Sequence, residues 1–93
     1  MNREQILETA KKTVCHDRNE QYGEPEDNFW RVAKLWSSYF GDALKRAITA
    51  RDVANMMILF KIARNAAAPK DDNWIDIAGY AACGGEVDDG QSL

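Results

Sequence analysis

Cysteine, proline and histidine are scarce in this sequence, and long apolar runs are absent. The chain of 93 residues has two cysteines, two prolines and one histidine. Cys15 and Cys83 lie far apart with no CxxC motif, which argues against a structural zinc site and favours two free thiols. No apolar run approaches the roughly 20 residues of a transmembrane helix, and the N-terminus has no signal-peptide core. We therefore expect a cytoplasmic protein that does not enter a membrane.

Positive charge is also in short supply. Lysine and arginine total 12 against 15 aspartates and glutamates, so the formal net charge is -3. A protein that binds nucleic acid through a basic face normally has more basic than acidic residues, so the sequence argues against nucleic acid as a partner. The sequence also lacks a glycine-rich phosphate loop and an HExxH zinc motif, which excludes the enzyme classes that depend on them.

What the sequence does contain is typical of a small helical domain. β-branched residues never alternate with polar ones over the length of a strand, so we predict an all-α fold. The apolar periodicity predicts four helices, over residues 2–16, 27–40, 49–68 and 71–83. Gly84 and Gly85 are expected to end the last helix. Residues 1–86 form a single predicted domain, and residues 87–93 form an acidic tail that we expect to fray.

The helix that begins at Thr49 is expected to lie at the centre of the fold. Thr49 and Asp52 have the spacing of a capping box. Only Asn55 and Lys61 interrupt the apolar run over residues 53–63. A helix that is apolar on nearly all sides is normally enclosed by its neighbours, which predicts a central position.

Two features predict a homodimer or a larger assembly. A chain of this length buries only about 60–65% of its unfolded surface, and oligomerisation is a common remedy for a small core. Gly79 stands in mid-helix, where glycine costs about 1 kcal/mol relative to alanine. Because Ala78, Ala81 and Ala82 are also small, we expect another helix or a ligand to approach closely there.

The last predicted helix carries the first candidate site. Asp72, Asp76 and Tyr80 follow one another at four-residue spacing and so lie on one stripe. Asp76 stands between two isoleucines and needs a partner if it is buried. Two interpretations stay open for it: an ion pair with Lys61 or Arg64, or a contact to a hard cation or a nucleotide.

The preceding helix and the charged loop near residue 20 carry two further candidates. Asp52 is either a capping acid or a ligand, and Lys61 is either a snorkelling side chain or the partner of a carboxylate or phosphate. Arg18 offers a planar fork of donors and Tyr22 a stacking face, which suits a phosphate and a base. Alternatively, Tyr22 packs into the bundle and Arg18 pairs with a glutamate. We predict that Lys61, with Arg64 beside it, shares one polar pocket with Asp76.

Two stretches carry a family resemblance. One reads R-x3-Y-G-x4-N-F-x3-A-x-L-W-x2-Y from Arg18 to Tyr39. The other runs from Asp52 to Glu86 and reads D-V-A-x-M-M-I-L-x-K-I-A-R, then D-N-W-x-D-I-A-G-Y-A-A-C-G-G-E. Together they resemble a group of small proteins that phages and prophages encode, known mainly as a domain of unknown function. That group is in turn similar, more distantly, to the MazG-like all-α nucleoside triphosphate pyrophosphohydrolases.

The MazG-like resemblance implies a helical bundle that pairs or tetramerises, with acidic residues holding Mg²⁺ against the phosphates of a nucleotide. Asp76 matches the final acid of the family's E-x-x-D, and Asp72 or Asn73 lies near the preceding one. Asp52 with Asn55 stands in for the E-x-x-E of the neighbouring helix, so one full glutamate pair is missing. A sparse carboxylate set with basic residues nearby suits phosphate binding better than phosphate cleavage.

The sequence leaves two functions open. The first is a nucleotide-handling protein of MazG-like descent, which binds a nucleotide or nucleotide signal in an inter-helix polar pocket and has weak pyrophosphohydrolase activity at most. Asp52 and Asp76 are then the catalytic residues, and these two hold the metal together with Asp72. The substrate-binding residues are then Lys61, Arg64, Arg18, Tyr22 and Asn73. The second function is non-enzymatic counter-defence, in which a phage protein inhibits a host immune system by binding a host protein or sequestering its signal.

Overall fold

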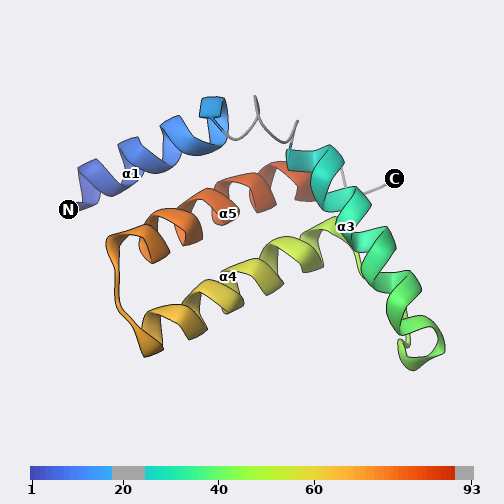
Figure 1. Cartoon of the computed structure of the whole chain (residues 1–93). Coiled ribbons are helices and arrows are strands. Elements are labelled where there is room, and N and C mark those ends of the chain that lie inside the picture. The colour runs from blue at the N-terminus through green and yellow to red at the C-terminus, as the bar shows by residue number, and fades with distance from the viewer. Residues whose placement is uncertain (18–24, 90–93) are drawn as a thin grey trace.

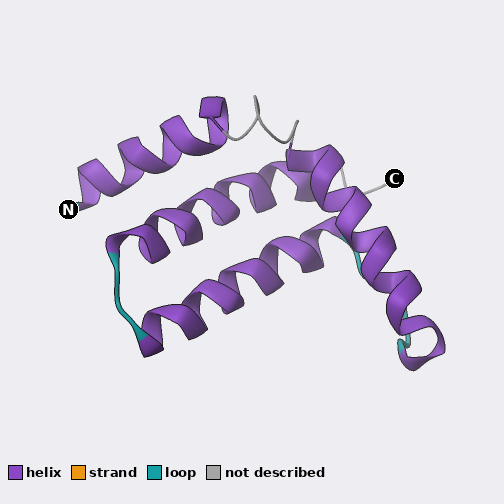
Figure 2. Ribbon diagram, in the orientation of Figure 1, coloured by secondary structure: helices purple, strands orange, loops and turns teal. Residues whose placement is uncertain are grey.

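The structure is a computed structural model that describes residues 1–17 and 25–89. Its elements, in order, are α1 (Arg3–Lys12), the π-helical turn η1 (Thr13–Asp17), α3 (Pro25–Phe40), the 3-10 turn η2 (Gly41–Ala43), α4 (Ala50–Ala67) and α5 (Asp71–Asp89). Figure 2 shows helices and short loops, and the described ranges contain no strand. The all-α prediction is confirmed. None of the helices in this part of the chain is long and apolar enough to span a bilayer.

Side-chain caps fix the starts of α1 and α4. At α1, Gln5 N donates to Asn2 Oδ1 and Asn2 N donates to Gln5 Oε1, both at 2.8 Å. At α4, Asp52 N donates to Thr49 Oγ1 at 3.1 Å, and Thr49 N donates to Asp52 Oδ2 at 2.9 Å. Each reciprocal pair satisfies two backbone donors that would otherwise lack a partner. The predicted capping box at Thr49 is confirmed.

Helices α1, α5 and α4 lie side by side in that order, and α3 crosses one end of the α4–α5 pair (Figure 1). The central helix is therefore α5, and the prediction that residues 49–68 form the central helix is wrong. Met56, Leu59 and Phe60 of α4 are exposed, so the described neighbours of α4 do not enclose it. An apolar run shows which residues avoid water, but not how many neighbouring helices the chain supplies.

The core lies where α3 crosses the α4–α5 pair. Its buried members are Phe29, Ala33, Ala50, Val53, Ala54, Cys83 and Val87. The ring of Phe29 lies 6.3 Å, centroid to centroid, from the ring of Tyr80 on α5. Three of the seven buried residues are alanines, so the helices approach one another closely but enclose little apolar volume.

Two glycines mark the closest approaches to α5. A Cβ built on Gly79 would lie 2.7 Å from Val14 Cγ1, and a Cβ built on Gly84 would lie 2.9 Å from the Cβ of Ala54. Both distances are well below an ordinary carbon–carbon contact of about 3.5–4.0 Å. The close approach predicted at Gly79 is confirmed, and the approaching segment is η1 of the same chain.

The last helix is longer than the sequence predicted. Instead of ending at Cys83, α5 continues through Gly84 and Gly85 to Asp89, so the predicted helix end is wrong. Each glycine lowers helix propensity by about 1 kcal/mol relative to alanine. The packing of Gly84 against α4 and the burial of Val87 in the core offset that loss.

Candidate functional site

Two charged side chains that interrupt apolar runs meet between α4 and α5. Lys61 Nζ lies 2.8 Å from Asp76 Oδ2. The side chains of Lys61 and Asp76 are 14% and 22% exposed, so the pair is largely withdrawn from water. Each charge thereby has the opposite charge that burial demands. Of the two interpretations left open for Asp76, the structure shows the ion pair with Lys61.

The second predicted carboxylate, Asp52, also has a basic partner. Arg46 Nη1 and Nη2 both donate to its carboxylate, and the Nη2–Oδ1 distance is 3.1 Å. These hydrogen bonds from Arg46, together with those from Thr49, hold the pKa of the Asp52 carboxyl well below its usual range. Asp52 therefore caps α4 and ties the preceding segment to it.

The remaining predicted residues have separate surroundings. Asn73 is buried, and its Nδ2 donates to Asn65 Oδ1 at 3.3 Å and to Ala68 O at 3.2 Å, which fastens the turn between α4 and α5. Asp72 is exposed in the first turn of α5. The guanidinium of Arg64 lies 4.6 Å from the centroid of a phenylalanine ring on α4. Arg18 and Tyr22 lie outside the described residues.

The structure therefore brings Lys61 and Asp76 together but leaves Asp52 apart from them. Lys61 follows Asp52 by nine positions, which is about 13 Å along a helix axis. Among residues 1–17 and 25–89, no group of three or more histidines, cysteines, aspartates or glutamates is placed to hold a metal ion. The role of Asp52, Asp72 and Asp76 as Mg²⁺ ligands stays a prediction.

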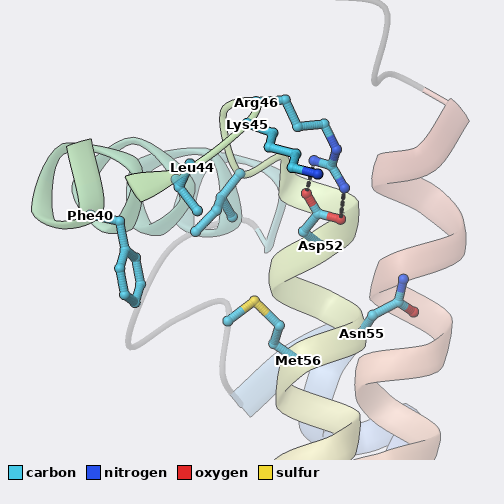
Figure 3. Close-up of a pocket in the computed structure, with 8 residues that line it drawn as sticks. Phe40, Leu44, Lys45, Arg46, Asp52, Asn55 and Met56 are labelled. Carbon is cyan, nitrogen blue, oxygen red and sulfur yellow. Dashed lines mark hydrogen bonds and ion pairs between the residues drawn. The ribbon is translucent and has the colours of Figure 1, made fainter. Parts of the chain in front are cut away.

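A pocket lies at the opposite end of α4, at a place that the sequence analysis missed. It is open to solvent, has a volume of about 410 Å³, and is lined by the end of α3, the linker to α4 and the first turns of α4. Figure 3 shows the side chains around it. The apolar lining residues are Phe40, Leu44, Ile48 and Met56, and the polar ones are Lys45, Arg46, Asp52 and Asn55.

Local contacts fix the linker that forms one wall of the pocket. Gly41 has a φ of 54°, a left-handed conformation that glycine adopts readily, and it turns the chain away from α3. Further on, Ile48 N donates to Ser37 Oγ at 2.8 Å, which anchors the linker to α3. Arg46 donates to Ala47 O at 3.0 Å as well as to Asp52. The pocket wall is thus held at both ends.

The chemistry of this pocket suits an anionic ligand with an apolar part. Its volume falls within the range of about 300–1,000 Å³ that is typical of small-molecule sites. Lys45 forms no ion pair with any residue that the structure describes, whereas Arg46 is held by Asp52. Two of the residues singled out in the sequence, Asp52 and Asn55, line this pocket. Its basic residues, the adjacent Lys45 and Arg46, are uninformative in the sequence until the fold places them beside α4.

Comparison with known proteins identifies phage relatives. The chain is 44% identical over 81 residues to the Gene 55 protein of Mycobacterium phage D29, covering 86% of this chain and 51% of the relative. It is 43% identical over 79 residues to the Gene 55 protein of Mycobacterium phage L5, covering 82% of this chain and 47% of that protein. The chain thus spans about half the length of these curated relatives. No solved structure matches the chain.

A family model matches almost the whole chain. The model describes a domain of unknown function, DUF6378, and it matches residues 5–88. The expected resemblance to small phage proteins of such a family is confirmed, while the more distant resemblance to the MazG-like enzymes and the cytoplasmic location stay predictions. Because the match extends over residues 5–88, the chain belongs to the DUF6378 family.

Proposed function

We propose that this chain is a phage-type protein that binds a nucleotide, without hydrolysing it, in the pocket beside the start of α4. The observation that carries the proposal is the combination of an apolar wall with two basic side chains at the rim, Lys45 and Arg46. A nucleotide has the matching parts, a flat base and a charged phosphate group. The proposal keeps the nucleotide-binding function expected from the sequence but moves its site away from Lys61.

Each part of the pocket has a role in this proposal. Phe40 and Met56 are exposed apolar side chains against which a base can stack. The ammonium group of Lys45 is the principal phosphate contact, because no carboxylate among the described residues pairs with it. The side-chain amide of Asn55 can both donate to and accept from the edge of a base. Arg46 adds positive charge while its bonds to Asp52 keep the rim in position.

Two ion pairs favour binding over hydrolysis. Metal-assisted attack on a phosphate requires carboxylate oxygens that are free to hold the cation. Asp76 has Lys61 as its partner and Asp52 has Arg46, so both of the predicted catalytic carboxylates are engaged by basic side chains. Pyrophosphohydrolase activity would require both carboxylates to exchange these partners for a metal ion.

The proposal is tested by calorimetric titration with a panel of nucleoside mono-, di- and triphosphates, with and without Mg²⁺. We expect at least one nucleotide to bind and to raise the melting temperature, since a ligand at 100 times its Kd stabilises the folded state by about 2.7 kcal/mol. Lys45→Ala should weaken binding by about tenfold or more, the value of one charge-assisted hydrogen bond.

Lys11→Ala on α1 is the matched control, because it removes the same charge from an exposed position far from the pocket. If no nucleotide binds, or if Lys45→Ala binds like the Lys11→Ala control, the proposal is wrong. Release of pyrophosphate in the presence of Mg²⁺ would show that the chain hydrolyses its ligand and would contradict the binding-only part.

Counter-defence is the second candidate function, in which the chain inhibits a host immune system through a bound host protein or a sequestered nucleotide signal. The phage origin of its relatives favours this candidate. Sequestration of a signal would use the same pocket, so a nucleotide from the panel would again bind. Binding of a host protein would become the preferred function if every nucleotide in the panel failed to bind.

A further inference from the structure

The outer side of α4 presents a continuous apolar surface. Met56, Leu59, Phe60, Ala63 and Ala67 follow one another at spacings of three, one, three and four residues, so they share one side of the helix. All five are exposed. We call these five residues the α4 stripe. Its spacing is that of a helix that packs against another helix, yet all five residues are exposed in the part of the chain that the structure describes, and Met56 at its start also lines the pocket beside the end of α3.

The surroundings of the α4 stripe are nearly free of charge. Between Asp52 and Lys70, the sequence has two charged residues, Lys61 and Arg64. Lys61 is paired with Asp76, and Arg64 lies over the ring of Phe60. Methionine, phenylalanine and arginine are enriched in protein interfaces, and lysine and acidic residues are depleted there. Met56 and Phe60 of the α4 stripe and the neighbouring Arg64 are of the enriched kinds, whereas alanine, which supplies two of the five stripe residues, is depleted in interfaces.

We propose that a second copy of this chain packs on the α4 stripe, with the two α4 helices antiparallel about a twofold axis between Leu59 and Phe60. The stripe is self-complementary in this orientation. Its N-terminal half is bulky and its C-terminal half consists of alanines, so Met56 of one copy meets the partner's Ala63. A parallel pair would instead set bulky residues against bulky residues and alanine against alanine, leaving gaps.

Two observations favour a second copy over a different protein. The core is small in the part of the chain that the structure describes, since four of the nine buried apolar residues there are alanines and Val53 is the largest side chain that is fully buried. Small domains commonly gain burial by oligomerising. A second copy is present whenever the chain is made, and none of the five stripe residues is charged, so the stripe of one copy does not repel the stripe of the other.

The size of the α4 stripe sets the expected strength of the dimer. The stripe contains three large side chains, and each of them is only partly exposed. The surface that it can bury is therefore smaller than the roughly 800 Å² per partner of a standard interface. We therefore expect a dissociation constant on the order of 1–100 µM rather than a nanomolar one. The α4 stripe shares Met56 with the wall of the proposed nucleotide site, whereas Leu59 and Ala63 do not line the pocket. A substitution at Leu59 therefore tests the dimer without changing a residue of the pocket.

Sedimentation velocity on the full chain between roughly 1 and 500 µM, a range that brackets the expected dissociation constant, measures the assembly. The expected result is a rise from the 10.5 kDa monomer toward twice that mass. Leu59→Glu places two like charges beside the twofold axis and should abolish the rise. The matched control is Leu7→Glu on α1, because Leu7 is 63% exposed and Leu59 is 62% exposed. Far-ultraviolet circular dichroism checks that both variants remain helical.

A cross-linking experiment tests the orientation in a chain that also carries Cys15→Ser. The antiparallel pair predicts that a copy with Met56→Cys forms a disulfide with a copy carrying Ala63→Cys more readily than either copy does with itself. A monomer at every concentration, or a Leu59→Glu variant that dimerises as well as Leu7→Glu, overturns the proposal. Preferential cross-linking of Met56→Cys to itself overturns the antiparallel orientation. A chain that binds nucleotide but stays monomeric would contradict the dimer and leave the proposed function intact.

Discussion

The two ends of the α4–α5 pair are held together by different chemistry. At the apolar end, where α3 crosses, Gly84 lies directly against Ala54 and the contact contains no charge. At the polar end, Lys61 pairs with Asp76, and Asn73 bonds to the turn that joins the helices. The predicted catalytic carboxylate on α5 thus belongs to the helix contact, and the open pocket lies beside the apolar end. Of the polar residues that interrupt the apolar runs, Lys61 and Asp76 thus pair across the helix contact, whereas Asn55 lines the pocket.

The largest expected effect is at the apolar end. Phe29→Ala removes a buried ring from the core and should lower the free energy of unfolding by about 3–5 kcal/mol. Trp74→Ala is the comparison, because Trp74 is exposed on α5 and its loss should lower stability by about 1 kcal/mol or less. Urea unfolding measures both, and equal losses would mean that the core does not lie where α3 crosses.

At the polar end, Asp76→Asn should lower the free energy of unfolding by about 2 kcal/mol. Breaking a fully buried pair costs about 3–5 kcal/mol, and the remaining exposure of Lys61 and Asp76 reduces that figure. The double variant Lys61→Met with Asp76→Leu should recover most of the loss, because it removes both charges. An Asp76→Asn variant as stable as the unmodified chain would show that the pair has no structural role.

Gly84 and Gly85 offer a finer comparison within α5. A methyl group at Gly84 would overlap Ala54, so Gly84→Ala should lose about 1 kcal/mol, with overpacking outweighing the gain in helix propensity. Nothing lies within 4 Å of a Cβ at Gly85, so Gly85→Ala should gain about 0.5–1 kcal/mol. Thermal unfolding of the two variants should show shifts of opposite sign; shifts of the same sign would contradict the close approach of α4 to Gly84.

Asp52 provides a pH-dependent test of the wall beside the pocket. Its pKa is lower in the folded chain than the ordinary value of about 3.9, so the folded state favours the ionised carboxyl. The resulting stability is present above about pH 4 and is lost as the pH falls toward the folded-state pKa. Asp52→Asn should therefore melt at a lower temperature at pH 7, and this difference should shrink as the pH falls. A difference that does not change with pH would exclude the ion pair with Arg46 as its source.

The helices and one of the two ion pairs could be predicted from the sequence. The start of a helix depends on residues that are close in sequence, as the capping pair of Thr49 and Asp52 shows. A charged residue inside an apolar run needs a partner of opposite charge, and for Asp76 the sequence offered Lys61 or Arg64. The central position of α5 and its length depend on contacts between distant residues, such as Gly84 with Ala54. The pocket depends on how the linker after Gly41 folds back on α4, and no local pattern encodes that path.

The most direct test of the account compares two lysines at opposite ends of α4. Titration of one binding nucleotide into Lys45→Ala and Lys61→Met, each checked for helical content, separates the pocket from the polar end. If the nucleotide binds in the pocket, Lys45→Ala should lose about tenfold or more in affinity, while Lys61→Met should bind like the unmodified chain and lose only stability. The reverse result, with affinity lost in Lys61→Met and kept in Lys45→Ala, would place the site between α4 and α5 and contradict the account.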